Sequence, residues 1–123
     1  MLRPAAVLAL IVMLAPGSAA AADTAAGQAV FARCKICHTT EAGGRNLVGP
    51  NLHGVFGRKA GSLEGFAYSE GMKNSGIVWD DDKLRQYLAK PRDFIPGNKM
   101  AFPGMKDENE ISNLLAYLHE ATK

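Results

Sequence analysis

Cys34-Lys35-Ile36-Cys37-His38 is the most informative stretch of this sequence. Two thiols stand two residues apart, and a histidine directly follows the second one. The pattern is the C-x-x-C-H signature of c-type haem attachment. Thiols at this spacing can add to the two vinyl groups of haem, and the adjacent imidazole can then bind the iron. The stretch therefore predicts one covalent haem c, with Cys34 and Cys37 as its attachment points and His38 as an axial ligand.

Two other uses of the cysteine pair remain open on the residues alone. A dithiol redox pair belongs with a sheet flanked by helices, whereas no alternating strand pattern is visible here. A structural zinc site needs four ligands, and the sequence has no second Cys or His pair at a suitable spacing. Both alternatives are therefore weaker than haem attachment.

The first residues have the composition of a secretory signal peptide. Arg3 supplies a positive charge, Val7–Ala15 an apolar core that is too short to span a bilayer, and Ala20-Ala21-Ala22 a small-residue cleavage site. We expect residues 1–22 to be a cleaved signal peptide and residues 23–123 to form one domain in the periplasm. Retention of the signal as a membrane anchor is the alternative.

The charge of the chain is nearly balanced. Lys and Arg exceed Asp and Glu by two, for a formal net charge of +2. A nucleic-acid-binding domain usually shows a strongly basic balance. No nucleic-acid partner is therefore expected.

A helix is predicted at each end of the domain. The first begins near Asp23 or Thr24, and its apolar face is formed by Gly27, Val30, Phe31 and Cys34. The second spans 108–121, and its apolar face is formed by Ile111, Leu114, Leu115 and Leu118. Asp107, just before this helix, and Glu110, in its first turn, resemble a capping box. Because Gly27 has no side chain, a large residue such as Tyr117 could cross it closely.

A third helix is predicted between the two. Asp80, Asp81 and Asp82 mark its start, Leu84, Tyr87 and Leu88 share one face, and Pro91 marks its end. A short helical turn is expected around Ser69–Asn74. Thr39–Gly65 and Lys90–Lys106 are rich in Gly and Pro and are predicted to be loops. Loops of this length need something to wrap, and a flat apolar haem would serve.

The sixth iron ligand must be chosen by context. Of the three methionines in the expected mature chain, Met100 lies mid-loop between Pro96-Gly97 and Pro103-Gly104, where a rigid loop could press its sulfur onto iron. Met72 and Met105 adjoin predicted helices and read as packing residues. His53, in the glycine-rich loop, is an alternative sixth ligand, whereas His119, at the end of the last helix, reads as structural.

The sequence resembles the class I c-type cytochromes, close to mitochondrial cytochrome c and bacterial cytochrome c2. The resemblance covers nearly all of residues 27–123 and depends on several motifs in the family's order: C-x-x-C-H, Gly49-Pro50-Asn51-Leu52-His53-Gly54, Gly57-Arg58-Lys59, Gly76-Ile77-Val78-Trp79 and Pro96-Gly97-Asn98-Lys99-Met100-Ala101-Phe102. It implies an all-α fold in which crossing N- and C-terminal helices, shorter helices and long loops surround the haem.

The resemblance also implies roles for single residues. Met100 would be the sixth ligand, and the Pro50 carbonyl would accept a hydrogen bond from the His38 ring. Arg58, Tyr68 and Trp79 would surround the haem propionates, and the Tyr87 hydroxyl would lie near the methionine sulfur.

One residue near the expected pocket departs from the family pattern. Met72 stands where the family usually has an asparagine. The change would alter the polar surroundings of the haem, and the Met72 thioether is a minor alternative ligand there.

With a histidine and a methionine on the iron, no coordination position is open for a substrate. We therefore expect an electron carrier and not an enzyme. The alternative is a peroxidase-like haem enzyme or ligand sensor with a labile sixth ligand.

The implied partners are membrane electron-transfer complexes. A quinol-oxidising cytochrome complex would be the donor, and a terminal oxidase, a photosynthetic reaction centre or a periplasmic reductase the acceptor. Docking of the monomer would use Arg33, Arg92, Lys99 and Lys106. Gln28, Leu47 and Asp107 stand where the mitochondrial protein has lysines. We therefore expect a weaker attraction to acidic partner surfaces than in that protein, which should still depend on salt concentration.

Overall fold

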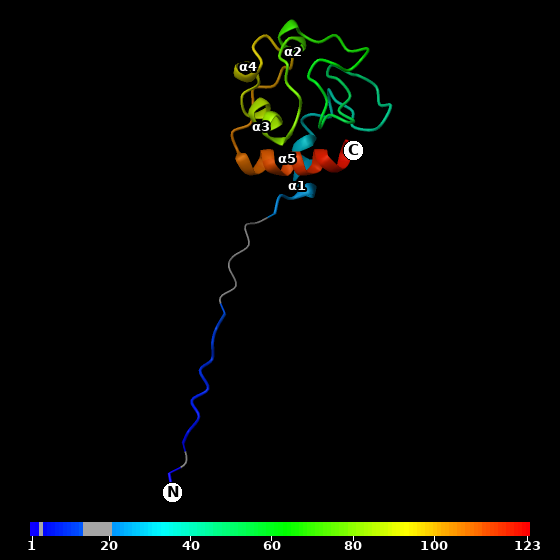
Figure 1. The fold of residues 1–123 in the computed structure, drawn as a ribbon. Helices are drawn as coiled ribbons and strands as arrows, with labels where there is room; N and C mark the ends of the chain where they lie inside the picture. Colours follow the sequence, from blue (N-terminus) through cyan, green and yellow to red (C-terminus); the bar gives the residue numbers. More distant parts are fainter. Residues whose placement is uncertain (3, 14–20) are drawn as a thin grey trace.

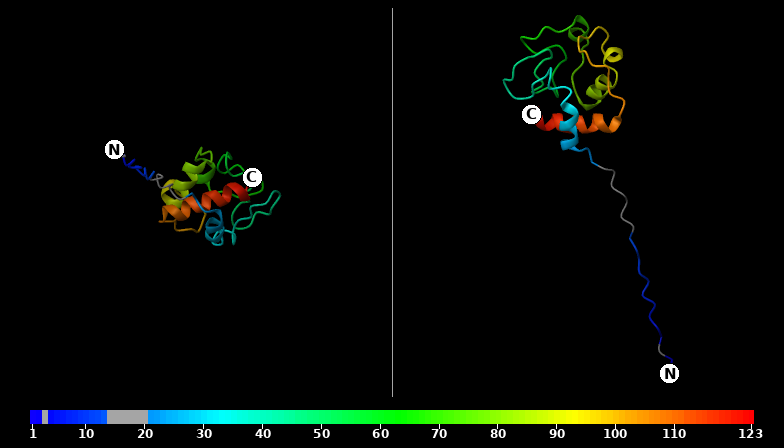
Figure 2. Two further views of the ribbon diagram at one scale, coloured as in Figure 1. Left: turned by 90° about the horizontal axis from the view of Figure 1, so that it is seen from below. Right: turned by 180° about the vertical axis from the view of Figure 1, so that it is seen from behind.

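Helices α1 (Thr24–Phe31) and α5 (Glu108–Ala121) cross each other closely on one side of the molecule (Figures 1 and 2). A Cβ atom added to Gly27 would lie 1.9 Å from the backbone oxygen of Asn113 and 2.9 Å from the Tyr117 Cβ. Beside it, the rings of Phe31 and Tyr117 are 5.3 Å apart. The crossing predicted from the missing side chain of Gly27 is thus confirmed.

The computed structural model describes residues 1–2, 4–13 and 21–123. Arg3, the end of the predicted apolar core and Ala20 of the predicted cleavage site lie outside the described residues. Residues 4–13 form no helix, and their large apolar side chains, from Val7 to Met13, are exposed. None of the helices in the described ranges has the length and apolar character that crossing a bilayer requires.

Both terminal helices begin with an aspartate cap. The Asp23 side chain accepts a hydrogen bond from the Ala26 N–H, and the Asp107 side chain accepts from the N–H groups of Asn109 and Glu110. The other half of the predicted capping box, in which the Glu110 carboxylate would accept from the Asp107 N–H, was wrong. The Glu110 carboxylate pairs with the Arg33 guanidinium at 3.2 Å, because the crossing brings the chain after α1 alongside the first turn of α5.

The shorter helices follow the predicted order with one addition. α2 (Glu70–Lys73) and α3 (Asp81–Ala89) form where they were expected, and the structure adds that Ser69 caps the first and Asp80 the second. Pro91 ends α3, but it also opens a fourth short helix, α4 (Pro91–Phe94), in a segment predicted to be loop. The fixed φ of proline favours the first helical position, where its missing N–H costs nothing.

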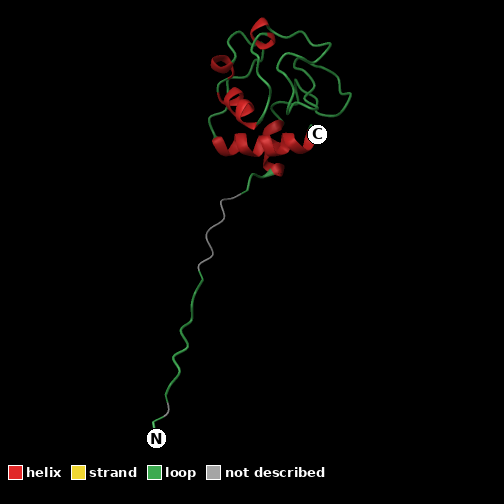
Figure 3. Ribbon diagram, viewed as in Figure 1, coloured by secondary structure: helices red, strands yellow, loops and turns green. Residues whose placement is uncertain are grey.

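The long segment Thr39–Gly65 contains no helix (Figure 3). An isolated antiparallel bridge joins Lys59 to Val78, and the Trp79 N–H donates to the Arg58 carbonyl at 2.9 Å. No strand forms anywhere in the described residues, which agrees with the predicted all-α class.

The apolar core lies between α5 and the other elements. Ile111, Leu114, Leu115 and Leu118 of α5 are buried, together with Phe31, Leu84, Ile95 and Met105. Two side chains contact His119 at the end of α5, in addition to the helix dipole considered above. Its Nε2 lies 2.5 Å from an Asp81 carboxylate oxygen, and its ring stacks on Phe56 at 3.7 Å.

Candidate functional site

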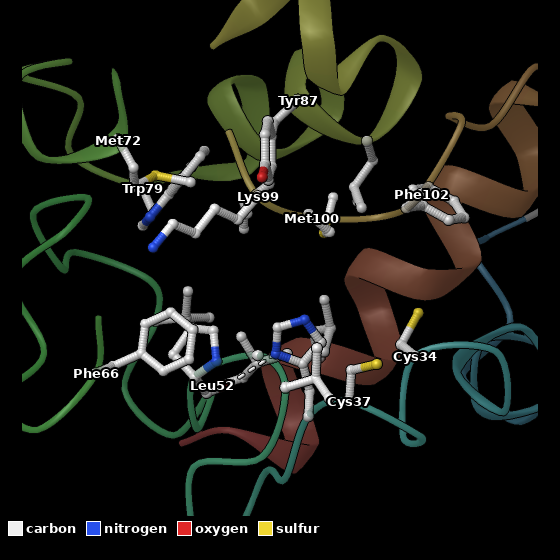
Figure 4. A pocket seen from close by; sticks show the side chains of 18 of the residues that line it. Cys34, Cys37, Leu52, Phe66, Met72, Trp79, Tyr87, Lys99, Met100 and Phe102 are labelled. Carbon is white, nitrogen blue, oxygen red and sulfur yellow. Dashed lines mark hydrogen bonds between the residues drawn. The ribbon is translucent and has the colours of Figure 1, made fainter. Parts of the chain in front are cut away.

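A cavity of about 230 Å³ opens between the core and the loops, and its wall is mainly apolar (Figure 4). Phe31 of α1, Leu84 and Leu88 of α3, and Leu114 and Leu118 of α5 form part of the wall. All nine residues predicted for the site also line this cavity: Cys34, Cys37, His38, Pro50, Arg58, Tyr68, Trp79, Tyr87 and Met100. The fold thus gathers residues from distant parts of the chain around one apolar space.

The two cysteines lie in the tight turns that follow α1. The Cys34 N–H donates to the Phe31 carbonyl at 2.7 Å, and the N–H groups of Cys37 and His38 both donate to the Cys34 carbonyl at 3.0 Å. Both thiols are free, with Cys34 and Cys37 on the same side of the cavity (Figure 4). Burial raises the pKa of Cys34, while the Arg33 guanidinium lowers it and Cys37 adds a smaller rise.

The orientation of the His38 ring is fixed by the next turn of the loop. Its Nδ1 lies 2.7 Å from the Pro50 carbonyl oxygen and must donate, because a carbonyl oxygen only accepts. The other ring nitrogen, Nε2, is then the unprotonated one in the neutral ring and is available to a metal. Burial lowers the pKa of His38, and the Pro50 carbonyl partly offsets this, so the neutral ring is favoured.

Gly49 provides the space in which this ring lies. A Cβ atom at Gly49 would lie 2.4 Å from the His38 Cε1 and 2.8 Å from each ring nitrogen. The Gly49 N–H also donates to the Cys37 carbonyl at 2.8 Å, which ties the loop to the cysteine turn. The glycine is therefore required by contact with the imidazole.

Met100 lies across the cavity from Cys37 and Leu52 (Figure 4). It follows α4 in an irregular segment, and the Phe102 N–H donates to its carbonyl at 2.9 Å. Lys99 also lines the cavity, and its ammonium group donates to the Ala67 carbonyl at 3.3 Å. Met72 is a second thioether on the wall, beside Trp79 (Figure 4).

Polar side chains line part of the same cavity. The Arg58 guanidinium donates to the carbonyl oxygens of Asn51 at 3.0 Å and His53 at 2.5 Å. The Trp79 ring packs on Tyr87 at 5.1 Å, and the Tyr68 ring packs on Phe66 at 4.8 Å. These contacts hold the predicted polar residues beside an otherwise apolar space.

His53, the alternative sixth ligand, lies elsewhere in the described chain. Its side chain is not among those lining the cavity, and its Nδ1 is buried without a hydrogen-bond partner in the described residues. The arrangement therefore favours Met100 over His53 as a partner for His38.

The chemistry of the wall fits a covalent haem. Paired thiols, an imidazole with a free Nε2 and a thioether across the cavity match the attachment and axial groups that haem requires. No group of three or more His, Cys, Asp or Glu side chains that could hold a bare metal ion occurs in residues 1–2, 4–13 and 21–123. The zinc alternative thus finds no site among them.

The family model for cytochrome c matches residues 24–122. The chain belongs to the cytochrome c family. It is 50% identical over 102 residues to cytochrome c2 from Blastochloris viridis, which covers 83% of this chain and 80% of the relative. It is 48% identical over 100 residues to cytochrome c2 from Rhodoblastus acidophilus, which covers 81% of this chain and 94% of the relative.

A solved structure supports the same conclusion. Cytochrome cH from Methylobacterium extorquens is 46% identical and superposes with a TM-score of 0.75, over 80% of this chain and 98% of that structure. This cytochrome is therefore an electron carrier with covalent haem c and not an enzyme.

Two asparagines of this cytochrome have contacts that sequence reasoning did not assign. Asn51 is buried, and its side-chain amide donates to the Thr39 hydroxyl at 2.7 Å and to the Glu41 carbonyl at 3.0 Å, which holds the loop next to Pro50. Asn98 precedes Met100 by two residues and is hydrogen-bonded to its N–H. Both residues occur in the motifs quoted above, but spacing alone does not show which backbone groups their amides reach.

Proposed function

We propose that this cytochrome is a soluble, monomeric carrier of single electrons between membrane redox complexes in the periplasm. Cys34 and Cys37 would hold the haem, and His38 and Met100 would ligate its iron in a low-spin state. The observation that supports this most directly is the placement of Met100 across one apolar cavity from the cysteine pair. His38, oriented by the Pro50 carbonyl, lines the same cavity.

The bound haem supplies reversible one-electron chemistry at iron, and a histidine with a methionine favours the ferrous state. His38 presents Nε2 because its Nδ1 proton is committed to the Pro50 carbonyl. Such a contact on the far ring nitrogen orients the ligand and raises its basicity. Met100 would occupy the opposite side, so that no position remains open to a substrate.

The remaining wall residues would exclude water and hold the propionates. Leu84, Leu114 and Leu118 present apolar side chains to the cavity. A guanidinium has five N–H donors, and Arg58 uses donors on two of its nitrogens for the Asn51 and His53 carbonyls. Its remaining donors, with Tyr68 and Trp79, would bind carboxylates that are costly to bury unpaired.

Export is the part of the proposal that concerns residues 1–22. These residues would be a cleaved signal peptide, and residues 23–123 the mature domain. The exposure of the apolar side chains from Val7 to Met13 supports this, because a segment that belonged to the domain would bury them. N-terminal sequencing of protein from a periplasmic extract should give Asp23 as the first residue, within a few positions. A mature chain that begins at Met1 would contradict export by cleavage.

The proposed docking face consists of four basic residues, two of which line the cavity. Arg33 and Lys99 line the cavity. Arg92 and Lys106 are exposed and lie seven residues to either side of Lys99 in the sequence. Arg33 is paired with Glu110, so it would attract an acidic partner less than a free cation does. The proposed partners are a quinol-oxidising cytochrome complex as donor and a terminal oxidase, photosynthetic reaction centre or periplasmic reductase as acceptor.

Replacement of Met100 tests the proposal directly. The wild-type ferric protein should be low-spin, with the weak long-wavelength band of sulfur on haem. Met100→Ala should lose that band, become high-spin, bind carbon monoxide rapidly when reduced and have a lower reduction potential. Met72→Ala is the matched control, since it removes the other thioether from the wall. A sulfur band that survives in Met100→Ala would contradict the ligand assignment, and a high-spin wild type would favour a peroxidase-like enzyme.

A further inference from the structure

The side chain of Asn98 uses its whole hydrogen-bonding capacity around Met100. Its Nδ2 donates to the Pro91 carbonyl at 2.9 Å and to the Ile95 carbonyl at 3.0 Å. Its Oδ1 accepts from the Met100 N–H at 2.9 Å and lies 3.4 Å from the Tyr87 hydroxyl. A primary amide has two donors and room for two acceptor contacts, so every position is occupied.

These contacts connect the Met100 loop to rigid elements. Pro91 opens α4 and is almost fully buried, Ile95 directly follows that helix and is buried, and Tyr87 is buried on α3. The segment from Pro96 to Lys106 has no helix of its own. Its irregular backbone therefore depends on contacts with neighbouring elements for its position.

Few other contacts hold the backbone at Met100 itself. The Phe102 N–H bonds to the Met100 carbonyl within the loop, and Lys99 reaches Ala67 only through an exposed, flexible side chain. Farther along, the Met105 N–H donates to the Leu88 carbonyl at 2.9 Å. Among the described residues, Asn98 is the one whose side chain ties the Met100 N–H to the helix scaffold.

We propose that Asn98 is a positioning residue that keeps Met100 against the iron, by tying the Met100 N–H to α3 and to both ends of α4. The inference rests on the proposed function, because it takes Met100 as the sixth ligand. Without the amide, the loop should open more often, and an added ligand could then take the iron position that Met100 leaves.

Imidazole titration of the ferric holoprotein measures this opening. Imidazole binds only the form from which Met100 has left, so its apparent affinity is proportional to the fraction of open protein. We expect Asn98→Ala to bind imidazole about tenfold more tightly than wild type, which corresponds to about 1.4 kcal/mol in favour of the open form. The sulfur band should also disappear at a lower urea concentration in the variant, ahead of the loss of helix.

Two further variants separate positioning from general stability. Asn74→Ala removes an exposed asparagine amide at the end of α2 and should leave imidazole affinity unchanged. Asn98→Asp keeps the acceptors for Met100 and Tyr87 but loses both donors to Pro91 and Ile95, so it should also bind imidazole more tightly than wild type. If Asn98→Ala does not fold, this near-isosteric variant provides the test.

The outcomes separate a failure of the Asn98 positioning role from a failure of Met100 as the sixth ligand. A wild type without a sulfur band would contradict Met100 as ligand, and the inference would fail with it. If the wild type shows the band, imidazole affinities of the Asn98 variants within threefold of wild type would overturn the positioning role alone. Equal loss of the band and of helix in urea, with no change in imidazole binding, would indicate a purely structural residue.

Discussion

The Nδ1 of His38 donates a hydrogen bond to the Pro50 carbonyl oxygen across 2.7 Å, and Gly49 lies against the same ring. The bond uses a backbone oxygen, so replacing the Pro50 side chain would not remove it. The packing at Gly49 can be changed instead.

Gly49→Ala should displace the His38 ring, because the new Cβ would start 2.4 Å from its Cε1. Overpacking of this kind costs about 1–3 kcal/mol. We expect a lower urea midpoint together with a changed ferric spectrum and reduction potential. The control is Gly43→Ala, where φ is +71° and a Cβ would meet nothing within 4 Å. That variant should lose stability through backbone strain while its spectrum stays as in wild type. A Gly49→Ala spectrum equal to wild type would contradict the role of the contact.

Gly27→Ala should separate the crossing helices. The added Cβ would lie 1.9 Å from the Asn113 backbone oxygen, which cannot move without shifting α5. We expect a loss of more than about 3 kcal/mol in the free energy of unfolding, measured by urea denaturation followed by circular dichroism. Gln28→Ala, at the exposed neighbouring position, should change it by less than about 0.5 kcal/mol. Equal effects of the two variants would show that the crossing tolerates a side chain.

Tyr87 should make the stability depend on alkaline pH. Burial raises the pKa of Tyr87 from 10 to about 12 in the folded protein. The unfolded chain therefore loses the phenol proton first as pH rises. The contribution of neutral Tyr87 is fully present below pH 10 and is lost between pH 10 and about 12. Tyr87→Phe should have a shallower fall of the urea midpoint over this interval than wild type. Parallel curves for the two proteins would contradict the prediction.

Lys106 should contribute to partner docking through charge. It is exposed and would attract an acidic partner surface, so Lys106→Gln should slow electron transfer at low ionic strength. The difference from wild type should vanish as salt rises above about 0.1 M, where the screening length is about 10 Å. Lys123→Gln changes the net charge equally at the C-terminus and should have a smaller effect on the rate measured by stopped flow. A Lys106→Gln rate that is unaffected at every salt concentration would remove this residue from the docking face.

Local patterns were sufficient to predict much of this cytochrome. The apolar spacing of Ile111, Leu114, Leu115 and Leu118 predicted a helix over 108–121, and the structure has that helix. The C-x-x-C-H stretch predicted haem c, in agreement with the family. Both inferences work because spacing along one segment determines which side chains share a face, whatever the rest of the chain does.

Such local patterns could not predict contacts between distant segments of the chain. Three examples are the pairing of Glu110 with Arg33, the position of His119 between Asp81 and Phe56, and the four contacts of Asn98. The partners in these contacts are not related by the periodic spacing of a helix or strand. The sequence by itself determined which residues would line the proposed haem site and predicted every described helix except α4. Only the tertiary structure decided which backbone carbonyls orient those groups, because a side-chain amide or imidazole bonds to whatever the folded chain brings within about 3 Å.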